Sequence, residues 1–218
     1  GGLLRASVAY YPGNLMQIRE LFVSGKRATR ARYPDDDFLR VQASGPDRRT
    51  GFTFYPDDIP QIEDSGSAEL VFFHDWSTSR LGIKEIDTAN RYITVADPIG
   101  PVLPQFAIDN FEKHPRYYLE HSKSFLTQPG EWYLDTIQKE LIYMPLPGEN
   151  LETIHAAVPL SSQLIRVLGT TARPFKRLHI QGLTMEHCLW AIPANGYAPG
   201  SWCGGAGLML LQLSIELI

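Results

Sequence analysis

The chain has 218 residues, with 20 basic and 24 acidic side chains, a net charge of -4 and 44% hydrophobic residues. These values are typical of a globular chain that can bury a core, and they exclude a disordered, collagen-like or coiled-coil protein. Apolar runs such as Leu208–Leu211 are far shorter than the roughly 18 to 20 residues that span a bilayer, so the sequence predicts no transmembrane helix.

The two ends of the chain have the character of internal positions. The chain begins at Gly1-Gly2, without an initiator methionine or a signal peptide, and it ends inside the apolar run Leu213–Ile218. We therefore expect a segment of a longer protein, with part of its functional chemistry elsewhere.

A basic cluster lies between Lys26 and Arg32. Because phosphate neutralisation drives non-specific nucleic-acid binding, a nucleic-acid patch is one interpretation. In a strand, however, Arg30 and Arg32 share a face, and the acidic run at 35–37 offers them local partners. We therefore expect a solvated, salt-bridged strand and no nucleic-acid partner.

Strand signals dominate the first two thirds of the chain. Short runs rich in Val, Ile, Phe, Tyr and Thr recur between Pro, Gly, Asp and Asn, which predicts an all-β protein. Residues 58–63 and 106–113 have the pattern of single helical turns, too short to organise a fold. The expected strands are Glu20–Val23, Gly51–Tyr55, Ala68–Phe73, Leu81–Ile86 and Arg91–Val95.

Two further runs predict an antiparallel hairpin. In the first, Trp132 and Leu134 alternate with Glu131, Tyr133 and Asp135, and the second follows at 140–144. Alternation of this kind gives the hairpin one apolar and one more polar face.

The pattern changes after the breaker cluster Pro145–Asn150, and acidic side chains nearly vanish beyond residue 160. Apolar strands are expected at Leu164–Leu168, Leu178–Met185 and Leu208–Ile218. Strands that follow one another at roughly regular spacing suggest stacked coils of a parallel solenoid, in which each coil buries its face only against its neighbours.

A series of motifs also occurs in a recognisable order. The motifs are Leu21–Pro34, Phe72–Arg80, Pro115–His121, Gln128–Asp135, Ile142–Pro145, Pro147–Glu149 and Gly182–Trp190, followed by Pro193 and Gly196-Tyr197. Between about residue 15 and residue 200, the chain resembles the bacterial right-handed parallel β-helix proteins of the pectate-lyase-like superfamily. Within that superfamily it is most similar to the β-helix glycoside hydrolases of the fucosidase and xylanase type.

The resemblance implies an all-β fold class, namely a partial right-handed parallel β-helix with an antiparallel β-rich inserted domain. In this interpretation residues 1–20 are an early β-helix coil or lead-in, residues 21–150 are the inserted domain, and residues 151–218 are parallel coils. It also implies an extracellular or periplasmic location and a polysaccharide or oligosaccharide substrate.

The function implied by the resemblance is that of a glycoside hydrolase acting on a complex polysaccharide. Its catalytic carboxylates would lie on coils beyond this chain, so the segment alone would be inactive. Two alternatives stay open. A polysaccharide lyase would be favoured by an Arg or Lys beside clustered Asp residues, and a non-catalytic carbohydrate-binding or surface β-helix would have no close carboxylate pair along its groove.

The loop between Cys188 and Cys203 carries the best candidates for substrate binding. Protruding loops carry function, and aromatic side chains offer flat apolar faces to sugar rings. The alternative for Trp190 is that it covers the interface between insertion and helix. Glu186 and His187 are adjacent on an expected strand and would point to opposite faces, which argues against a catalytic dyad. The candidate residues are His187, Trp190, Tyr197 and Trp202.

Other chemistry-bearing residues have structural interpretations. Glu131 and Asp135 would lie roughly 13 Å apart along one strand face, too far for a hydrolase pair. We expect Asp75 to fix a turn and His179 to lie on a coil surface.

The cysteines lack a metal-binding spacing and the histidines are scattered, so we expect no metal site and no cofactor. Two reduced thiols are the default for Cys188 and Cys203, and a disulfide between them stays open in an oxidising compartment.

Overall fold

A computed structural model of the chain describes residues 2–74, 78–99, 107–110, 112–167, 170, 172–174, 176–189 and 215–217. Across these ranges the regular structure consists of β-strands and the short 3-10 turns η1 (Leu15–Gln17), η2 (Ser65–Ser67) and η4 (Lys123–Phe125). The described part contains no helix that is both long and apolar enough to cross a membrane. The predicted all-β class is confirmed.

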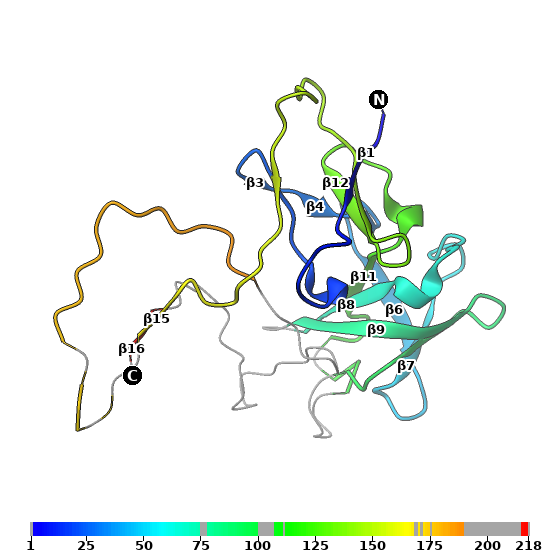
Figure 1. The fold of residues 1–218 in the computed structure, drawn as a ribbon. Coiled ribbons are helices and arrows are strands. Elements are labelled where there is room, and N and C mark those ends of the chain that lie inside the picture. Colours follow the sequence, from blue (N-terminus) through cyan, green and yellow to red (C-terminus); the bar gives the residue numbers. More distant parts are fainter. Residues whose placement is uncertain are drawn as a thin grey trace.

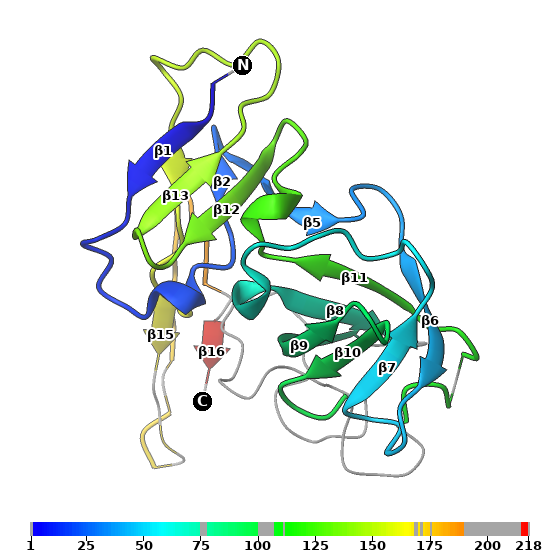
Figure 2. The same cartoon turned by 90° about the vertical axis from the view of Figure 1, so that its right-hand side faces the viewer.

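Six antiparallel strands close into a barrel (Figures 1 and 2). Going round the barrel, each strand pairs with the next, and β8 pairs with β11 to complete the ring. Closure leaves the ring without an unpaired edge strand. A short further strand, β5 (Arg32–Tyr33), also pairs with β11. The ring order is β11 (Arg116–Glu120), β6 (Leu39–Ser44), β7 (Gly51–Phe54), β10 (Tyr92–Val95), β9 (Thr78–Asp87) and β8 (Glu69–Phe73).

A second sheet lies beside the barrel and contains the predicted hairpin (Figure 2). Its order is β1 (Leu4–Ser7), β13 (Glu140–Tyr143), β12 (Glu131–Asp135) and β4 (Thr29–Arg30), with β4 parallel to β12. A small third sheet joins β14 (Ala156–Ala157), β2 (Phe22–Val23) and β3 (Lys26–Arg27). The segment 1–20 therefore contributes an edge strand to the hairpin sheet.

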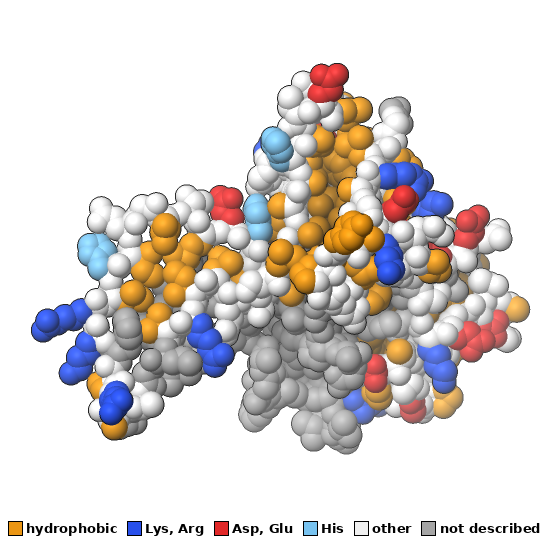
Figure 3. Space-filling view, in the orientation of Figure 1, with side chains coloured by type: hydrophobic (Ala, Val, Ile, Leu, Met, Phe, Trp, Pro, Cys, Tyr) orange, Lys and Arg blue, Asp and Glu red, His pale blue; other side chains and the backbone are white. Residues whose placement is uncertain are grey.

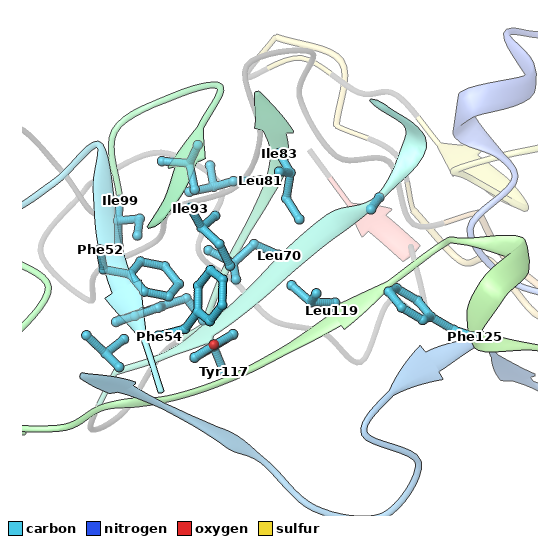
Figure 4. Packing of buried hydrophobic residues seen from close by; sticks show 14 of the residues in the cluster. Phe52, Phe54, Leu70, Leu81, Ile83, Ile93, Ile99, Tyr117, Leu119 and Phe125 are labelled. Carbon is cyan, nitrogen blue, oxygen red and sulfur yellow. The ribbon is translucent and has the colours of Figure 1, made fainter. Parts of the chain in front are cut away.

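Alternation along the strands fills the barrel. Leu70 and Phe72 of β8 and Tyr117 and Leu119 of β11 pack with Phe52 in one buried cluster (Figure 4). Aromatic and aliphatic side chains suit the pleated surface of a strand, and burying each one contributes about 1.5 to 3 kcal/mol. The barrel is therefore a packed core.

The hairpin is confirmed, and both of its faces are buried. Trp132 and Leu134 pack in a second cluster with residues of the lead-in such as Ile18, whereas Tyr133 and Ile142 pack against the barrel cluster. The expected polar face is wrong because the barrel covers it.

The five expected early strands correspond to β2, β7, β8, β9 and β10. The helical turn expected at residues 58–63 is absent, and the 3-10 turn η2 begins two residues later. Of the turn expected at 106–113, the described part at 107–110 forms a non-helical bend and turn.

We call residues 2–158, which contain the barrel and the hairpin sheet, the body. From residue 160 the chain leaves the body and follows an open curve, which we call the arm (residues 160–189; Figure 1). Here β15 (Ile165–Val167) pairs in parallel with β16 (Ile215–Leu217). The strand expected at Leu178–Met185 is wrong. The left-handed backbone of Arg177 (φ 66°) and Gly182 (φ 74°) interrupts an extended conformation there.

Candidate functional site

Two glutamates face each other on the outside of the barrel. Glu69 of β8 and Glu120 of β11 are direct partners in the strand register, and their neighbours Leu70 and Leu119 point into the core. Directly opposite residues of paired strands have Cβ atoms roughly 4.5 to 5.5 Å apart. Both side chains are nevertheless almost fully buried. A close carboxylate pair is the first requirement of a glycosidase, so this pair is the first candidate to test.

Three arginines surround this pair. Arg30 Nη1 donates to Glu69 Oε2 and to Glu120 Oε1, both at 2.9 Å. Arg19 Nη1 donates to Glu69 Oε1 at 3.0 Å, and Arg80 Nη1 donates to Glu120 Oε1 at 2.6 Å. We call these five residues the carboxylate–arginine cluster.

The arginines decide the protonation state of both glutamates. Burial alone would raise the pKa of Glu69, but the charges of Arg30 and Arg19 outweigh burial and hold that pKa far below its usual value. The pKa of Glu120 is likewise lowered, because Arg30 and Arg80 outweigh its burial and the repulsion from Glu69. A general acid must carry a proton near the working pH, and neither glutamate can. The cluster therefore cross-links the lead-in, β4 and the barrel, and neither of its glutamates has the protonation state of a general acid.

His121 follows Glu120 and lies beneath the same cluster. Its Nε2 is 3.1 Å from the carbonyl oxygen of Leu134, which makes Nε2 the protonated nitrogen, and its Nδ1 is 3.9 Å from Glu69 Oε1. Burial, followed by the charge of Arg30, lowers the pKa of His121 to about 4. The imidazole is therefore neutral and links the barrel to the hairpin.

The basic cluster of the sequence differs from its expected form. Arg30 is not solvated, since its side chain is only 8% exposed and its partners are more than thirty residues away. Arg32 does contact the acidic run, but through the backbone carbonyl of Asp37 at 2.5 Å. Arg27 is 66% exposed, but it pairs with Glu20, which is only 8% exposed and lies outside the acidic run. The sequence pattern could not reveal partners that the fold brings from other strands.

His187 is the one predicted substrate-binding residue within the described part of the chain. Its ring stacks on Phe22 of β2 with centroids 4.0 Å apart, and its Nε2 is 3.7 Å from Glu186 Oε2. The expectation that Glu186 and His187 point to opposite faces is wrong. His187 has left-handed backbone (φ 62°) outside any strand, so strand alternation does not apply.

The other three candidates, Trp190, Tyr197 and Trp202, lie outside the described residues, so their grouping with His187 stays a prediction. Cys203 also lies outside them, while Cys188 Sγ is 3.3 Å from the carbonyl oxygen of Ser161. The pairing of the two cysteines is therefore untested.

The remaining sequence candidates hold turns or lie on the surface. Glu131 accepts backbone N–H groups of Thr127 and Gln128, both at 2.9 Å. Asp135 accepts those of Ile137 and Gln138, at 3.0 and 2.8 Å. His179 is exposed, and Asp75 lies outside the described residues.

Asp64 is a structural residue that the sequence analysis missed. Its carboxylate accepts hydrogen bonds from Ser122 Oγ, from Tyr133 Oη at 2.9 Å and from the Lys123 N–H at 3.1 Å. Burial would raise its pKa, but these hydrogen bonds lower it instead. Within the ranges that the structure covers, no three His, Cys, Asp or Glu side chains are arranged to hold a metal ion.

A closed antiparallel barrel joined to a hairpin sheet defines the class of this fold. Residues 1–146 match the family described as the GH141 insertion domain, and the chain belongs to that family. It is therefore related to glycoside hydrolases.

A solved structure titled "Glycoside hydrolase" has a similar fold, with a TM-score of 0.60 and 23% sequence identity. The match covers 79% of this chain and 31% of the other, so the chain spans about a third of that protein. A comparison with curated proteins gave no match.

Proposed function

We propose that the chain is part of a glycoside hydrolase that cleaves a complex polysaccharide, with its catalytic carboxylates outside these residues. Membership of the insertion-domain family supports the carbohydrate assignment. One structural observation supports the location of the catalytic carboxylates outside these residues: Glu69 and Glu120, which lie opposite each other, are buried and are held ionised by arginines. Residues 1–146 would then shape the enzyme while other residues perform the hydrolysis.

The arm would begin a right-handed parallel β-helix. Its parallel pairing of β15 with β16 is the pairing that stacked coils make, and hairpins cannot provide it. Figure 3 shows hydrophobic side chains gathered on the arm. The exposed apolar residues of this region are Leu160, Leu164, Leu178, Leu183 and Met185. Neighbouring coils would cover such side chains, because solenoid coils bury their faces only against one another.

The saccharide would be contacted by the loop that follows the arm. His187 is packed on Phe22 and partly exposed, so its ring is held in a fixed orientation, and it precedes this loop in the sequence. Trp190, Tyr197 and Trp202 would supply flat apolar faces for sugar rings. The protein would act on its substrate outside the cytoplasm, in the periplasm or the extracellular medium.

The test is product analysis. The protein expressed from its complete gene is incubated with a panel of plant and algal polysaccharides, and the products are identified by mass spectrometry. Products that have gained one water per cleaved bond are expected. Unsaturated products would show elimination by a lyase and contradict the proposal, and intact polymer with measurable binding would point to a non-catalytic binding protein.

A substitution tests whether the carboxylate–arginine cluster takes part in catalysis. Glu120→Gln in the same protein should leave kcat within about twofold, because loss of a general acid or base would cost about a hundredfold or more. The matched variant Glu140→Gln changes an exposed carboxylate that pairs with Arg5. A hundredfold loss of kcat in Glu120→Gln alone, with the melting transition retained, would place Glu120 in the catalytic machinery.

A further inference from the structure

A second group of charged and aromatic side chains lies on the outer face of the barrel, beside the carboxylate–arginine cluster. Tyr118 and Phe73 alternate with core residues in the same way as Glu120 and Glu69, and Phe38 precedes β6. The Phe38 and Phe73 ring centroids are 5.0 Å apart at 77°, and those of Phe73 and Tyr118 are 5.8 Å apart. Phe38 and Phe73 are half-buried, so their rings remain partly open to solvent.

Two arginines lie over these rings. The Arg32 guanidinium carbon is 4.0 Å from the Tyr118 centroid and 5.6 Å from that of Phe38. The Arg116 guanidinium carbon is 5.7 Å from the Phe38 centroid and 5.8 Å from that of Phe73. Cation–π contacts of this kind fix the orientation of a guanidinium. We call these five residues the arginine–aromatic cluster.

The two clusters differ in how the arginine charge is compensated. Arg32 donates to neutral acceptors, the backbone carbonyls of Pro34 at 2.9 Å and Asp37 at 2.5 Å. Arg116 Nε forms a long ion pair with Glu112 Oε2 at 3.8 Å, beyond hydrogen-bonding distance, and Glu112 also pairs with Arg40. Neither Arg32 nor Arg116 donates a hydrogen bond to a carboxylate in the described chain.

Acidic side chains also occur near this surface. Asp37 Oδ1 accepts the backbone N–H of Phe38 at 2.8 Å, so this carboxylate is used within its own turn. Asp36 is exposed on the same loop. Its negative charge would weaken the attraction of an anion to Arg32. Removing this charge by substitution should therefore strengthen anion binding.

We infer that the arginine–aromatic cluster binds a carboxylate-bearing sugar residue, a uronate unit of the polysaccharide. A guanidinium offers a planar fork that matches a carboxylate, and half-buried rings beside it offer apolar contact to the sugar. Stacking on the rings orders both guanidiniums before the ligand arrives, which reduces the entropy cost of binding. This inference rests on the proposed saccharide function, and it assigns a second site on the barrel.

The probe is polygalacturonate, compared with the same polymer in fully methyl-esterified form, titrated calorimetrically into the protein expressed from its complete gene. Esterification removes the charge and keeps the sugar backbone. We expect the charged polymer to bind at least about tenfold more tightly, since one charge-assisted hydrogen bond accounts for a factor of this size, and we expect salt to weaken it. Equal affinities would overturn the inference.

Variants locate the site. Arg116→Ala and Arg32→Ala should each weaken binding of the charged polymer about fivefold to tenfold, and Arg116→Lys, which keeps the charge and loses the fork, should fall between. Asp36→Asn should tighten it about twofold, because it removes a like charge. Arg5→Ala, an exposed arginine of the hairpin sheet, is the matched control and should change nothing. Thermal melting checks that each variant is folded.

Further results would contradict the assignment. An equal loss in Arg5→Ala would show general attraction to surface charge. Unchanged affinity in both Arg116→Ala and Arg116→Lys would place the anion elsewhere. A sulfated polysaccharide that binds more tightly, with the same dependence on Arg116, would identify sulfate as the recognised group. Hydrolysis of neutral polymers without preference for uronate would defeat this inference alone, whereas Arg116-dependent uronate binding without hydrolysis would defeat only the proposed function.

Discussion

The body of the molecule and its arm use apolar side chains in opposite ways. In the body, residues 2–158, the barrel and the hairpin bury large side chains such as Phe72, Tyr117 and Trp132 completely. In the arm, Leu183 is 66% exposed and Leu178 is 42% exposed. The body closes its hydrogen-bonding ring by itself, whereas the strand pairing of the arm is limited to β15 with β16 in the described chain. The difference shows that the body contains its own stabilising contacts, whereas the arm leaves large apolar side chains exposed.

The largest expected difference in the free energy of unfolding is between a substitution in the core of the body and one in the arm. Phe72→Ala removes a fully buried ring from the barrel and should lower the free energy of unfolding by about 3 to 5 kcal/mol. Leu183→Ala, in the same 218-residue chain, should change it by no more than about 0.5 kcal/mol, because an exposed side chain loses few contacts. Urea denaturation of both variants measures the difference. Similar losses in both would show that the arm is packed as firmly as the body.

The next comparison, within the body, is between the carboxylate–arginine cluster and an exposed ion pair, again through the free energy of unfolding. Glu120→Ala leaves Arg30 and Arg80 without one of their carboxylates and should lower the free energy of unfolding by about 3 to 5 kcal/mol. Glu140→Ala breaks the exposed pair with Arg5 and should cost about 1 kcal/mol or less. If the two variants melted at the same temperature, the carboxylate–arginine cluster would not stabilise the contact between the lead-in, β4 and the barrel.

A smaller effect depends on pH. The pKa of His121 is about 4 in the folded chain, whereas the ordinary pKa of a histidine is 6.5, so the unfolded chain binds a proton more readily between these values. Stability from the neutral imidazole is therefore complete above about pH 6.5 and lost as the pH falls towards 4, by up to about 3 kcal/mol. The glutamates, with lowered pKa values, lose their contribution only below about pH 4.5.

Urea denaturation between pH 7 and pH 4.5 separates the two contributions. His121→Gln can still donate to the Leu134 carbonyl and should remove most of the pH dependence in this window. A wild-type stability that stays constant from pH 7 to pH 4.5 would contradict a buried neutral His121.

Local patterns in the sequence predicted the strands well, because alternation and breaker residues are local signals. Gly51–Tyr55 and Ala68–Phe73 could be assigned in this way, and so could the hairpin at 130–144. The ion-pair partners of buried charged residues could not be predicted from such local patterns. Nothing near Arg30 in the sequence indicates Glu69 or Glu120, since strand pairing brings them together. A glutamate within the apolar run Glu69–Phe73 was the one available signal of a buried charge.

The strand predictions could be tested, whereas the roles of the candidate site residues stay predictions. The loop between Cys188 and Cys203 was selected for its aromatic composition, and of the four candidate residues only His187, which precedes this loop, lies in the described chain. Its left-handed backbone made the strand-based argument about Glu186 fail. Arg116 and Phe38 are more than seventy positions apart, and only the folded barrel brings them together.

Hydrogen–deuterium exchange on the protein expressed from its complete gene is the most direct test of the account. If the arm begins a parallel β-helix, the backbone amides of β15 and of residues 178–189 should be protected to a degree comparable with β11 of the barrel. Rapid exchange throughout the arm, beside a fully protected barrel, would show a flexible tether and contradict the proposed β-helix.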